Sequence, residues 1–340
     1  MNQSATPAPV PAADTVLEVE DLHVAFGSRK ERVSVVNGVD FSLKRGEVLG
    51  VLGESGSGKS VMLRSLMGLF PRRTEHRGQI RLLGRDILGL GPRALRPIRG
   101  RDIAMVFQEP MTAFDPVFTV GRQITEAIRA HEGLSETEAR ARALELFERV
   151  AIPSAKSRLS NYPHEMSGGM RQRVMIALAL ACRPKVLLAD EPTTALDVTV
   201  QIQILLLLRE LQREMDMAVI FVTHDIGVAQ EVSDRIGVMY AGRFVEMAPT
   251  RDIIRSPRHP YTHGLLAATI HGQRRGDHIQ TIPGAPPNLA HLPEGCAFAE
   301  RCARAAPACR AAMPALAPLS PGHAVRCLDP EAETSAGQPR

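Results

Sequence analysis

The residue types with the clearest chemical meaning form one continuous segment, Gly53-Glu54-Ser55-Gly56-Ser57-Gly58-Lys59-Ser60. It matches the pattern G-x-x-x-x-G-K-[ST] and stands between a strand-like run and an apolar helical pattern. Glycines let the backbone wrap around phosphate with consecutive N–H groups pointing inward, and the following helix adds its positive end. Lys59 can reach the β- and γ-phosphates, and the Ser60 hydroxyl can bind Mg²⁺. The segment therefore predicts a nucleoside triphosphate site to which all eight residues contribute.

A second chemical signal is the acidic pair Asp190-Glu191, which ends the wholly apolar run 186–189. In nucleotidases with such a phosphate loop, an aspartate at this place holds Mg²⁺ directly or through water. An adjacent glutamate can accept a proton from attacking water. An isolated acidic pair is more often a solvated loop, but combined with the phosphate loop it indicates a Mg²⁺ ligand and a general base.

The elements that must position these residues alternate between strands and helices. A capping box, Ser135 with Glu138, marks the start of one helix. Strand alternating with helix implies right-handed crossovers, and we expect an α/β fold with a parallel sheet. The expected strands are 16–26, 33–36, 39–43, 48–52, 186–189 and 218–222, and the expected helices are 61–69, 136–150, 170–182 and 198–215.

Length and composition limit the remaining possibilities. The chain has 340 residues, 44% hydrophobic and 23% charged, which is typical of a soluble protein of about two domains. Lys plus Arg total 41 against 37 Asp plus Glu, a surplus too small to indicate a nucleic-acid partner. The longest apolar run, 174–182, is too short to span a bilayer, and the N-terminus shows no signal peptide. We expect a cytoplasmic protein with reduced thiols.

A family resemblance rests on Ser167-Gly168-Gly169-Met170-Arg171-Gln172-Arg173, which resembles the signature segment of ABC-type ATPases. Three further segments resemble other elements of that family in the same order. They are Phe107-Gln108-Glu109-Pro110 for the Q-loop, Ala195-Leu196-Asp197 for the D-loop and Val222-Thr223-His224-Asp225 for the switch histidine. The resemblance implies a P-loop nucleotidase core with a parallel sheet, an N-terminal antiparallel β subdomain and an α-helical signature subdomain at about 110–180.

The resemblance also implies roles for single residues, with ATP and Mg²⁺ as ligands. Glu191 would orient and deprotonate the attacking water, and His224 would contact the γ-phosphate. Gln108 would sense Mg²⁺ and the water while linking to a transmembrane subunit. Phe26 is the candidate aromatic that stacks on adenine, and burial in the strand core is the alternative for this side chain.

The resemblance further implies that two ATPase subunits close head to tail over two nucleotides. Each site would pair the Lys59 loop of one subunit with Ser167, Gly168 and Gly169 of the other, whose N–H groups open a helix. Asp197 of the D-loop would lie at the same nucleotide site.

A narrower resemblance, to oligopeptide and dipeptide importer ATPases, rests on 107–116, 169–177, 256–262 and 282–284. It implies peptide uptake driven by ATP, at the cytoplasmic face of the inner or plasma membrane. The implied partners are a second ATPase subunit, favoured as non-identical, two transmembrane permease subunits and, indirectly, an external solute-binding protein. Nickel or glutathione import by the same machinery stays open. A non-transport ABC ATPase acting on nucleic acid is the alternative from another class.

Four of the five cysteines, Cys296, Cys302, Cys309 and Cys327, cluster with the spacing C-x5-C-x6-C-x17-C. Zinc sites favour C-x2–4-C pairs, which are missing here, and the expected compartment disfavours disulfides. Iron–sulfur clusters accept broader spacing. The importer resemblance implies a [4Fe–4S] cluster; zinc, metal-free thiols and a redox-sensing role stay open. The fifth cysteine, Cys182, is interpreted as a small buried apolar residue.

Shifts in composition divide the chain. Residues 1–13 are rich in Ala and Pro and are expected to form a disordered tail. The ATPase domain is expected at 14–250. Residues 251–330, rich in Pro, His, Ala and Arg, are interpreted as a small C-terminal domain with little regular structure, and 331–340 as a loose tail.

Overall fold

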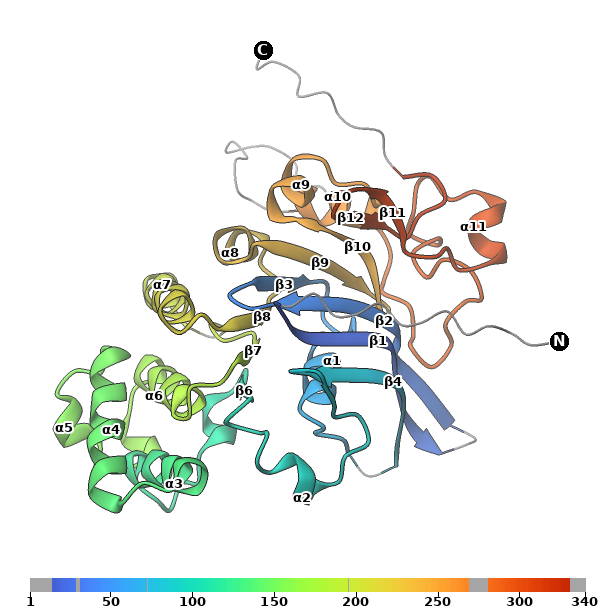
Figure 1. Cartoon of the computed structure of the whole chain (residues 1–340). Helices are drawn as coiled ribbons and strands as arrows, with labels where there is room; N and C mark the ends of the chain where they lie inside the picture. The colour runs from blue at the N-terminus through green and yellow to red at the C-terminus, as the bar shows by residue number, and fades with distance from the viewer. Residues whose placement is uncertain (1–13, 29–30, 72, 195, 269–280, 331–340) are drawn as a thin grey trace, which may run out of the picture.

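The computed structural model describes residues 14–28, 31–71, 73–194, 196–268 and 281–330. Two sheets organise this part of the chain (Figure 1). One has four strands in the order β2-β1-β4-β5, and the other has eight in the order β11-β12-β10-β9-β3-β8-β7-β6. The predicted tails, 1–13 and 331–340, and the predicted D-loop residue Ala195 lie outside the described residues.

The elements have the following bounds. The strands are β1 (Thr15–Ser28), β2 (Glu31–Lys44), β3 (Val48–Leu52), β4 (Thr74–Leu82), β5 (Arg85–Asp86), β6 (Ile103–Val106), β7 (Val186–Asp190), β8 (Ala218–Val222), β9 (Arg235–Tyr240), β10 (Arg243–Pro249), β11 (Ala317–Ser320) and β12 (His323–Val325). The α-helices are α1 (Lys59–Leu66), α2 (Pro92–Leu95), α3 (Val120–Glu132), α4 (Glu136–Arg149), α5 (Ala155–Arg158), α6 (Gly168–Leu180), α7 (Val198–Met215), α8 (Ile226–Val232), α9 (Thr250–Arg255), α10 (Pro260–Ala267) and α11 (Pro307–Ala311). Two short 3₁₀ helices are η1 (Pro110–Ala113) and η2 (Pro163–Glu165).

The centre of the large sheet is parallel, as the alternation of strands and helices predicts. β6, β7, β8, β3 and β9 lie side by side in this order, and each neighbouring pair is parallel. β3, β6, β7 and β8 are buried along their whole length, which explains their continuous apolar sequences. Because the strands are parallel, their carboxyl ends meet at one edge of the sheet.

The small sheet is antiparallel, and two of its strands, β4 and β5, are not among the strands expected from the sequence. It also differs from the expectation at β2. Residues 33–36 and 39–43, expected as two strands, belong to the single strand β2, which pairs with β1. Gly38, with φ of +79°, lies where the register with β1 shifts. A glycine in this conformation lets a strand accommodate a bulge without ending. The two apolar runs are therefore one strand with an irregularity.

The α-helical subdomain is inserted between β6 and β7 of the large sheet and forms a separate group of helices, α3 to α6, at one side of the molecule (Figure 1). The predicted capping box is present at α4: the Ser135 hydroxyl accepts from the Glu138 N–H, and the Glu138 carboxylate accepts from the Ser135 N–H. Cys182 is buried beside this group, and burial raises the pKa of its thiol to about 11. This agrees with its interpretation as a small apolar residue.

The C-terminal region is bound to the large sheet more closely than its composition suggests. β12 pairs with β10, and β11 pairs with β12, so the sheet continues into this region. The fully buried Glu246 of β10 accepts from the N–H groups of Arg258 and His259 and from the His323 ring. One buried carboxylate thus ties three C-terminal positions to the sheet. No described helix is long and apolar enough to cross a membrane.

Candidate functional site

The phosphate-binding loop joins β3 to α1 and needs glycine at two positions. Gly53 has φ of +155°, and a Cβ there would lie 2.2 Å from the Met239 carbonyl oxygen. Gly58 has φ of +102° and stands directly before the first residue of α1. Side chains at these positions would collide with neighbouring backbone or strain the turn. The glycines therefore let the loop pack closely against the neighbouring backbone.

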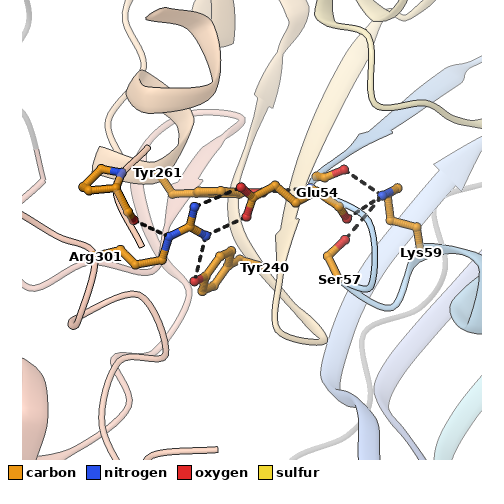
Figure 2. Close-up of polar contacts among 8 residues, drawn as sticks. Glu54, Ser57, Lys59, Tyr240, Tyr261 and Arg301 are labelled. Atoms are coloured by element: carbon orange, nitrogen blue, oxygen red, sulfur yellow. Dashed lines mark hydrogen bonds and ion pairs between the residues drawn. The ribbon is translucent and has the colours of Figure 1, made fainter. Parts of the chain in front are cut away.

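Lys59 is held inside this loop. Its ammonium group donates to the carbonyl oxygens of Gly53 (2.7 Å) and Glu54 (2.9 Å) and to the Ser57 hydroxyl (3.5 Å), as Figure 2 shows. Burial lowers the pKa of Lys59, and the nearby carboxylates of Glu191, Asp190 and Glu54 oppose that shift. The loop thus fixes a cation where the phosphates of a nucleotide would be recognised.

A Mg²⁺ site can be built from Ser60 and Asp190. The Ser60 hydroxyl donates to the Asp190 carboxylate at 2.8 Å, although the two residues are 130 positions apart. Burial raises the pKa of Asp190, and the hydrogen bond from Ser60 counteracts that shift. Hydroxyl and carboxylate oxygens are the hard ligands that Mg²⁺ prefers. The donor set therefore suits this ion.

Glu191 gathers three polar side chains around its carboxylate. Its Oε2 atom accepts from Gln108 Nε2 at 3.2 Å and from the Thr194 hydroxyl at 2.9 Å, and it lies 3.3 Å from His224 Nδ1. Glu191 has φ of +45°, a conformation that costs about 1–3 kcal/mol and is concentrated at functional sites. The structure brings together the three residues predicted as catalytic, and it adds Thr194. In the sequence, the only feature that could have indicated a role for Thr194 at this site is its position three residues after Glu191.

These residues line one open cavity of about 650 Å³. Its walls include the phosphate loop from Ser55 to Ser60, together with Gln108, Glu191 and His224. Three apolar residues that the sequence reasoning missed also line it: Val35 of β2, Val61 of α1 and Leu289 of the C-terminal region. Nothing in their residue types pointed to this site. The C-terminal region therefore forms part of the cavity wall.

The predicted signature residues do not lie in this cavity of their own chain. Ser167 is the N-cap of α6 and accepts from the Met170 N–H, while Gly169 packs against Val200 at the start of α7. Asp197 caps α7 by accepting from the Val200 N–H. The described residues that line the cavity do not include Ser167, Gly168, Gly169 or Asp197. Their predicted contact with nucleotide stays a prediction.

Phe26 is half-buried near the end of β1 and packs against the core between the small sheet and α1. Its strand neighbours are Val33 of β2 and Thr74 of β4. Among the described residues that line the cavity, Val35 is the one contributed by the small sheet, and Phe26 is not included. Adenine stacking by Phe26 stays a prediction.

Comparison with known proteins matches this geometry to a family. The family model for ABC transporters covers residues 36–194, and the model for the C-terminal region of oligopeptide/dipeptide transporters covers residues 245–309. The oligopeptide transport ATP-binding protein OppD of Salmonella typhimurium is 48% identical over 98% of this chain and 99% of its own length. The OppD of Escherichia coli is 47% identical over 94% of this chain and 95% of its own length.

The chain belongs to the ABC transporter ATP-binding proteins, in the oligopeptide/dipeptide branch. Among solved structures, the ATP-binding cassette MJ0796 in a dimeric post-hydrolysis state with ADP and Pi superposes with a TM-score of 0.63 at 30% identity. The match covers 69% of this chain and 99% of that chain. The expected fold class is thereby confirmed, and ATP hydrolysis in a transporter is the activity of this ABC protein.

The C-terminal part of this ABC protein brings its four cysteines to a common place. Cys296, Cys302, Cys309 and Cys327 line one small cavity of about 20 Å³, and none of them forms a disulfide. Burial raises the pKa of Cys296 and of Cys327. Among the described residues, no group of three or more Cys, His, Asp or Glu side chains is arranged to hold a metal ion. The described residues thus place the four cysteines around one cavity without an arrangement prepared for a metal ion.

Proposed function

We propose that this ABC protein hydrolyses ATP to drive the uptake of peptides. The observation that carries the proposal is the convergence of Gln108, Thr194 and His224 on the Glu191 carboxylate, beside the loop that holds Lys59. The match of residues 245–309 to the oligopeptide/dipeptide C-terminal region supports peptides as the solute. The OppD relatives support the same solute class and do not favour the nucleic-acid alternative.

In the proposed reaction, Glu191 is the general base. Its carboxylate takes a proton from water as the water oxygen bonds to the γ-phosphorus and the bond to the bridging oxygen of ADP breaks. Gln108 and His224 contact the same carboxylate, so they are placed to orient the water and contact the γ-phosphate. Lys59 adds positive charge for the β- and γ-phosphates. Ser60 and Asp190 would hold Mg²⁺, which neutralises charge on the phosphates when bound.

A second ATPase subunit would complete each nucleotide site. Ser167 and Gly168 are exposed at the start of α6, and the N-terminus of a helix favours an anion. They lie outside the cavity of their own chain, so a signature from a partner chain is needed at the γ-phosphate. The dimeric state of the related cassette MJ0796 supports this arrangement. Co-purification tests whether the partner is a second copy of this chain or a non-identical subunit. We expect a non-identical ATPase.

The proposed assembly places this subunit against two membrane permeases at the cytoplasmic face of the inner or plasma membrane. An external solute-binding protein would deliver the peptide. The Q-loop side chain Gln108 would connect the permeases to the catalytic carboxylate, because it donates to Glu191 and stands in the segment that leads from β6 to the helical subdomain. The OppD relatives support these partners, since they are transport ATP-binding proteins.

The test is uptake by the reconstituted complex. The ATPase, its permeases and the binding protein are placed in liposomes, and the import of labelled di- and oligopeptides, glutathione and nickel is measured with ATP. We expect import of peptides alone, and its loss with Glu191→Gln. Import of glutathione or nickel without peptide would contradict the solute assignment. Absence of any ATP-dependent import, with salt-sensitive DNA binding, would overturn the transport proposal.

We also propose that the four C-terminal cysteines hold a [4Fe–4S] cluster. Four thiols free of disulfides line one cavity, which suits a thiolate-bound cluster better than the hard cations. The described cavity has room for about one water molecule, so the thiols must move apart to hold a cluster. Iron and sulfide analysis after anaerobic purification tests this: four of each per chain is expected. Stoichiometric zinc, or intact protein without metal, would overturn it.

A further inference from the structure

The second residue of the phosphate loop, Glu54, turns away from the nucleotide cavity and pairs with the C-terminal region. Figure 2 shows its carboxylate directed at Arg301, on the side of the loop opposite Lys59. Arg301 Nη1 and Nη2 donate to the two carboxylate oxygens at 2.7 and 3.0 Å. A pair with both guanidinium nitrogens engaged is geometrically specific and stronger than an ordinary hydrogen bond.

Further contacts besides the pair with Glu54 hold the Arg301 side chain in place. Its side chain is 5% exposed, and its Nε donates to the Pro283 carbonyl oxygen at 2.9 Å. Its Nη1 also lies 3.2 Å from the Tyr240 hydroxyl. Burying a guanidinium group is costly unless its donors are satisfied, so the surrounding residues hold it in one position. A rigid cation from the C-terminal region is therefore aimed at the loop.

A second contact joins the same two regions. The backbone N–H of Glu54 donates to the hydroxyl of Tyr261 at 2.9 Å, and Tyr261 of α10 is fully buried. Both the main chain and the side chain of Glu54 are thus held by residues that follow β10. The phosphate loop of this chain is anchored from outside the part of the sequence that contains the nucleotide motifs.

Because Glu54 belongs to the phosphate loop, its contacts with Arg301 and Tyr261 affect nucleotide binding. A carboxylate one residue away from the loop glycines would repel a triphosphate if it were unpaired and free to turn. Arg301 neutralises it and directs it outward. We infer that Arg301 is a positioning residue for the phosphate loop, through which the cysteine-containing region sets the nucleotide affinity of its own subunit. The inference holds for any transported solute.

The position of Arg301 in the chain connects the cysteines to the phosphate loop. It directly precedes Cys302, and its N–H donates to the Phe298 carbonyl within the turn that begins at Cys296. A change in this turn moves the guanidinium group relative to Glu54. Linkage is reciprocal, so nucleotide bound at the loop must in turn stabilise the cysteine segment.

The experiment compares four proteins: unaltered, Arg301→Gln, Arg301→Gln with Glu54→Gln, and Arg304→Gln. Arg304 lies in the same segment and pairs with Asp329, away from the loop, and serves as the matched control. We expect Arg301→Gln to raise the ATP Kd and KM about 5- to 30-fold, with little change in kcat. The added Glu54→Gln restores most of the affinity because it removes the unpaired carboxylate. Arg304→Gln leaves affinity unchanged.

Two results would overturn the inference. One is an unchanged ATP Kd in folded Arg301→Gln. The other is a double variant that binds no better than Arg301→Gln, since the loss would then come from damage to the C-terminal region and not from the charge of Glu54. Arg301→Lys keeps the positive charge but cannot donate from two guanidinium nitrogens, and it should bind ATP with intermediate affinity.

Hydrogen exchange on the unaltered protein gives an independent readout that does not depend on a variant folding. Adding nucleotide should slow exchange of the amides between Cys296 and Cys309, and this protection should vanish in Arg301→Gln. Equal exchange with and without nucleotide in the unaltered protein would show that the two regions are uncoupled. Peptide uptake plays no part in these measurements, so their outcome is separate from that of the transport test.

Discussion

The nucleotide site and the cysteine region are built in opposite ways. The nucleotide residues stand at or just beyond the ends of four neighbouring parallel strands, β3, β8, β7 and β6. The cysteines lie in a segment with one short helix and two short strands, and its position depends on polar anchors such as Glu246 with His323. The first site is positioned by the central strands of the sheet. The second depends on the short edge strands β11 and β12 and on side chains that contact the sheet.

This difference predicts that substitutions in the two regions affect different properties of the protein. Side-chain changes in the nucleotide site should alter chemistry while leaving the fold intact, because the strands that position it are buried and apolar. Changes to the polar anchors of the cysteine region should alter stability first and nucleotide affinity second. The following predictions test that contrast.

The largest effect is expected from Glu191→Gln. Removing the proton acceptor should lower kcat for ATP hydrolysis by about 10²–10⁴-fold, since general bases contribute on this scale. ATP affinity should change little, because Lys59 and Ser60 stay in place. Phosphate release and nucleotide binding by the assembled complex are the measurements. Glu231→Gln, at an exposed position of α8, is the control. Normal turnover by Glu191→Gln would place the base elsewhere.

Ser60→Ala should act through Mg²⁺. Loss of the hydroxyl removes one oxygen ligand and the hydrogen bond to Asp190, and we expect the Mg²⁺ concentration for half-maximal hydrolysis to rise about 10- to 100-fold, as when groups that organise a metal site are removed. Ser65→Ala removes a hydroxyl from the same helix that donates only to the Val61 carbonyl, and it should leave the Mg²⁺ dependence unchanged. Equal effects of both substitutions would argue against this site.

Acid should weaken the anchor of the cysteine region. Burial lowers the pKa of His259 from 6.5 to about 4, so the folded protein resists its protonation. The stabilising contribution is complete above pH 6.5 and is lost as the pH falls towards 4. Between pH 7 and pH 5 we expect His259 to account for a loss of about 2 kcal/mol in the free energy of unfolding. Urea unfolding at both pH values measures it.

His259→Asn provides the comparison for this pH effect. Asparagine lacks the titrating ring, so the variant should lose about 2 kcal/mol less than the unaltered protein over the same pH interval. The remaining pH dependence belongs to the other titrating groups of the chain. The same slope in both proteins would mean that His259 is not the group responsible.

The smallest effect is expected from Tyr261→Phe. It removes the hydroxyl that accepts from the Glu54 N–H and should lower the free energy of unfolding by about 1–2 kcal/mol. Because the unpaired N–H belongs to the phosphate loop, ATP affinity should also fall, by about 3- to 10-fold. Thermal unfolding and ATP titration check both effects. Tyr162→Phe, on an exposed residue of the helical subdomain, should change neither.

The strands and helices that could be predicted share a clear local signal. Residues 198–215 and 218–222 were predicted with the bounds that α7 and β8 have, because caps and continuous apolar runs mark them. β2 is expected as two strands because the apolar pattern is interrupted between 33–36 and 39–43, although pairing with β1 continues past this break. β11 and β12 were not predicted, since three or four residues of mixed character carry no periodic pattern.

The sequence by itself determined the nucleotide chemistry. The phosphate loop, the acidic pair Asp190-Glu191, Gln108 and His224 are each local patterns at strand ends, and parallel strands necessarily gather such ends at one edge. Only the tertiary structure decided that the C-terminal region reaches this site. Glu54 and Arg301 are 247 positions apart, and neither residue type indicates its partner. A long-range ion pair depends on how whole elements pack. The periodicity of apolar residues and the spacing of motifs in the sequence do not predict that packing.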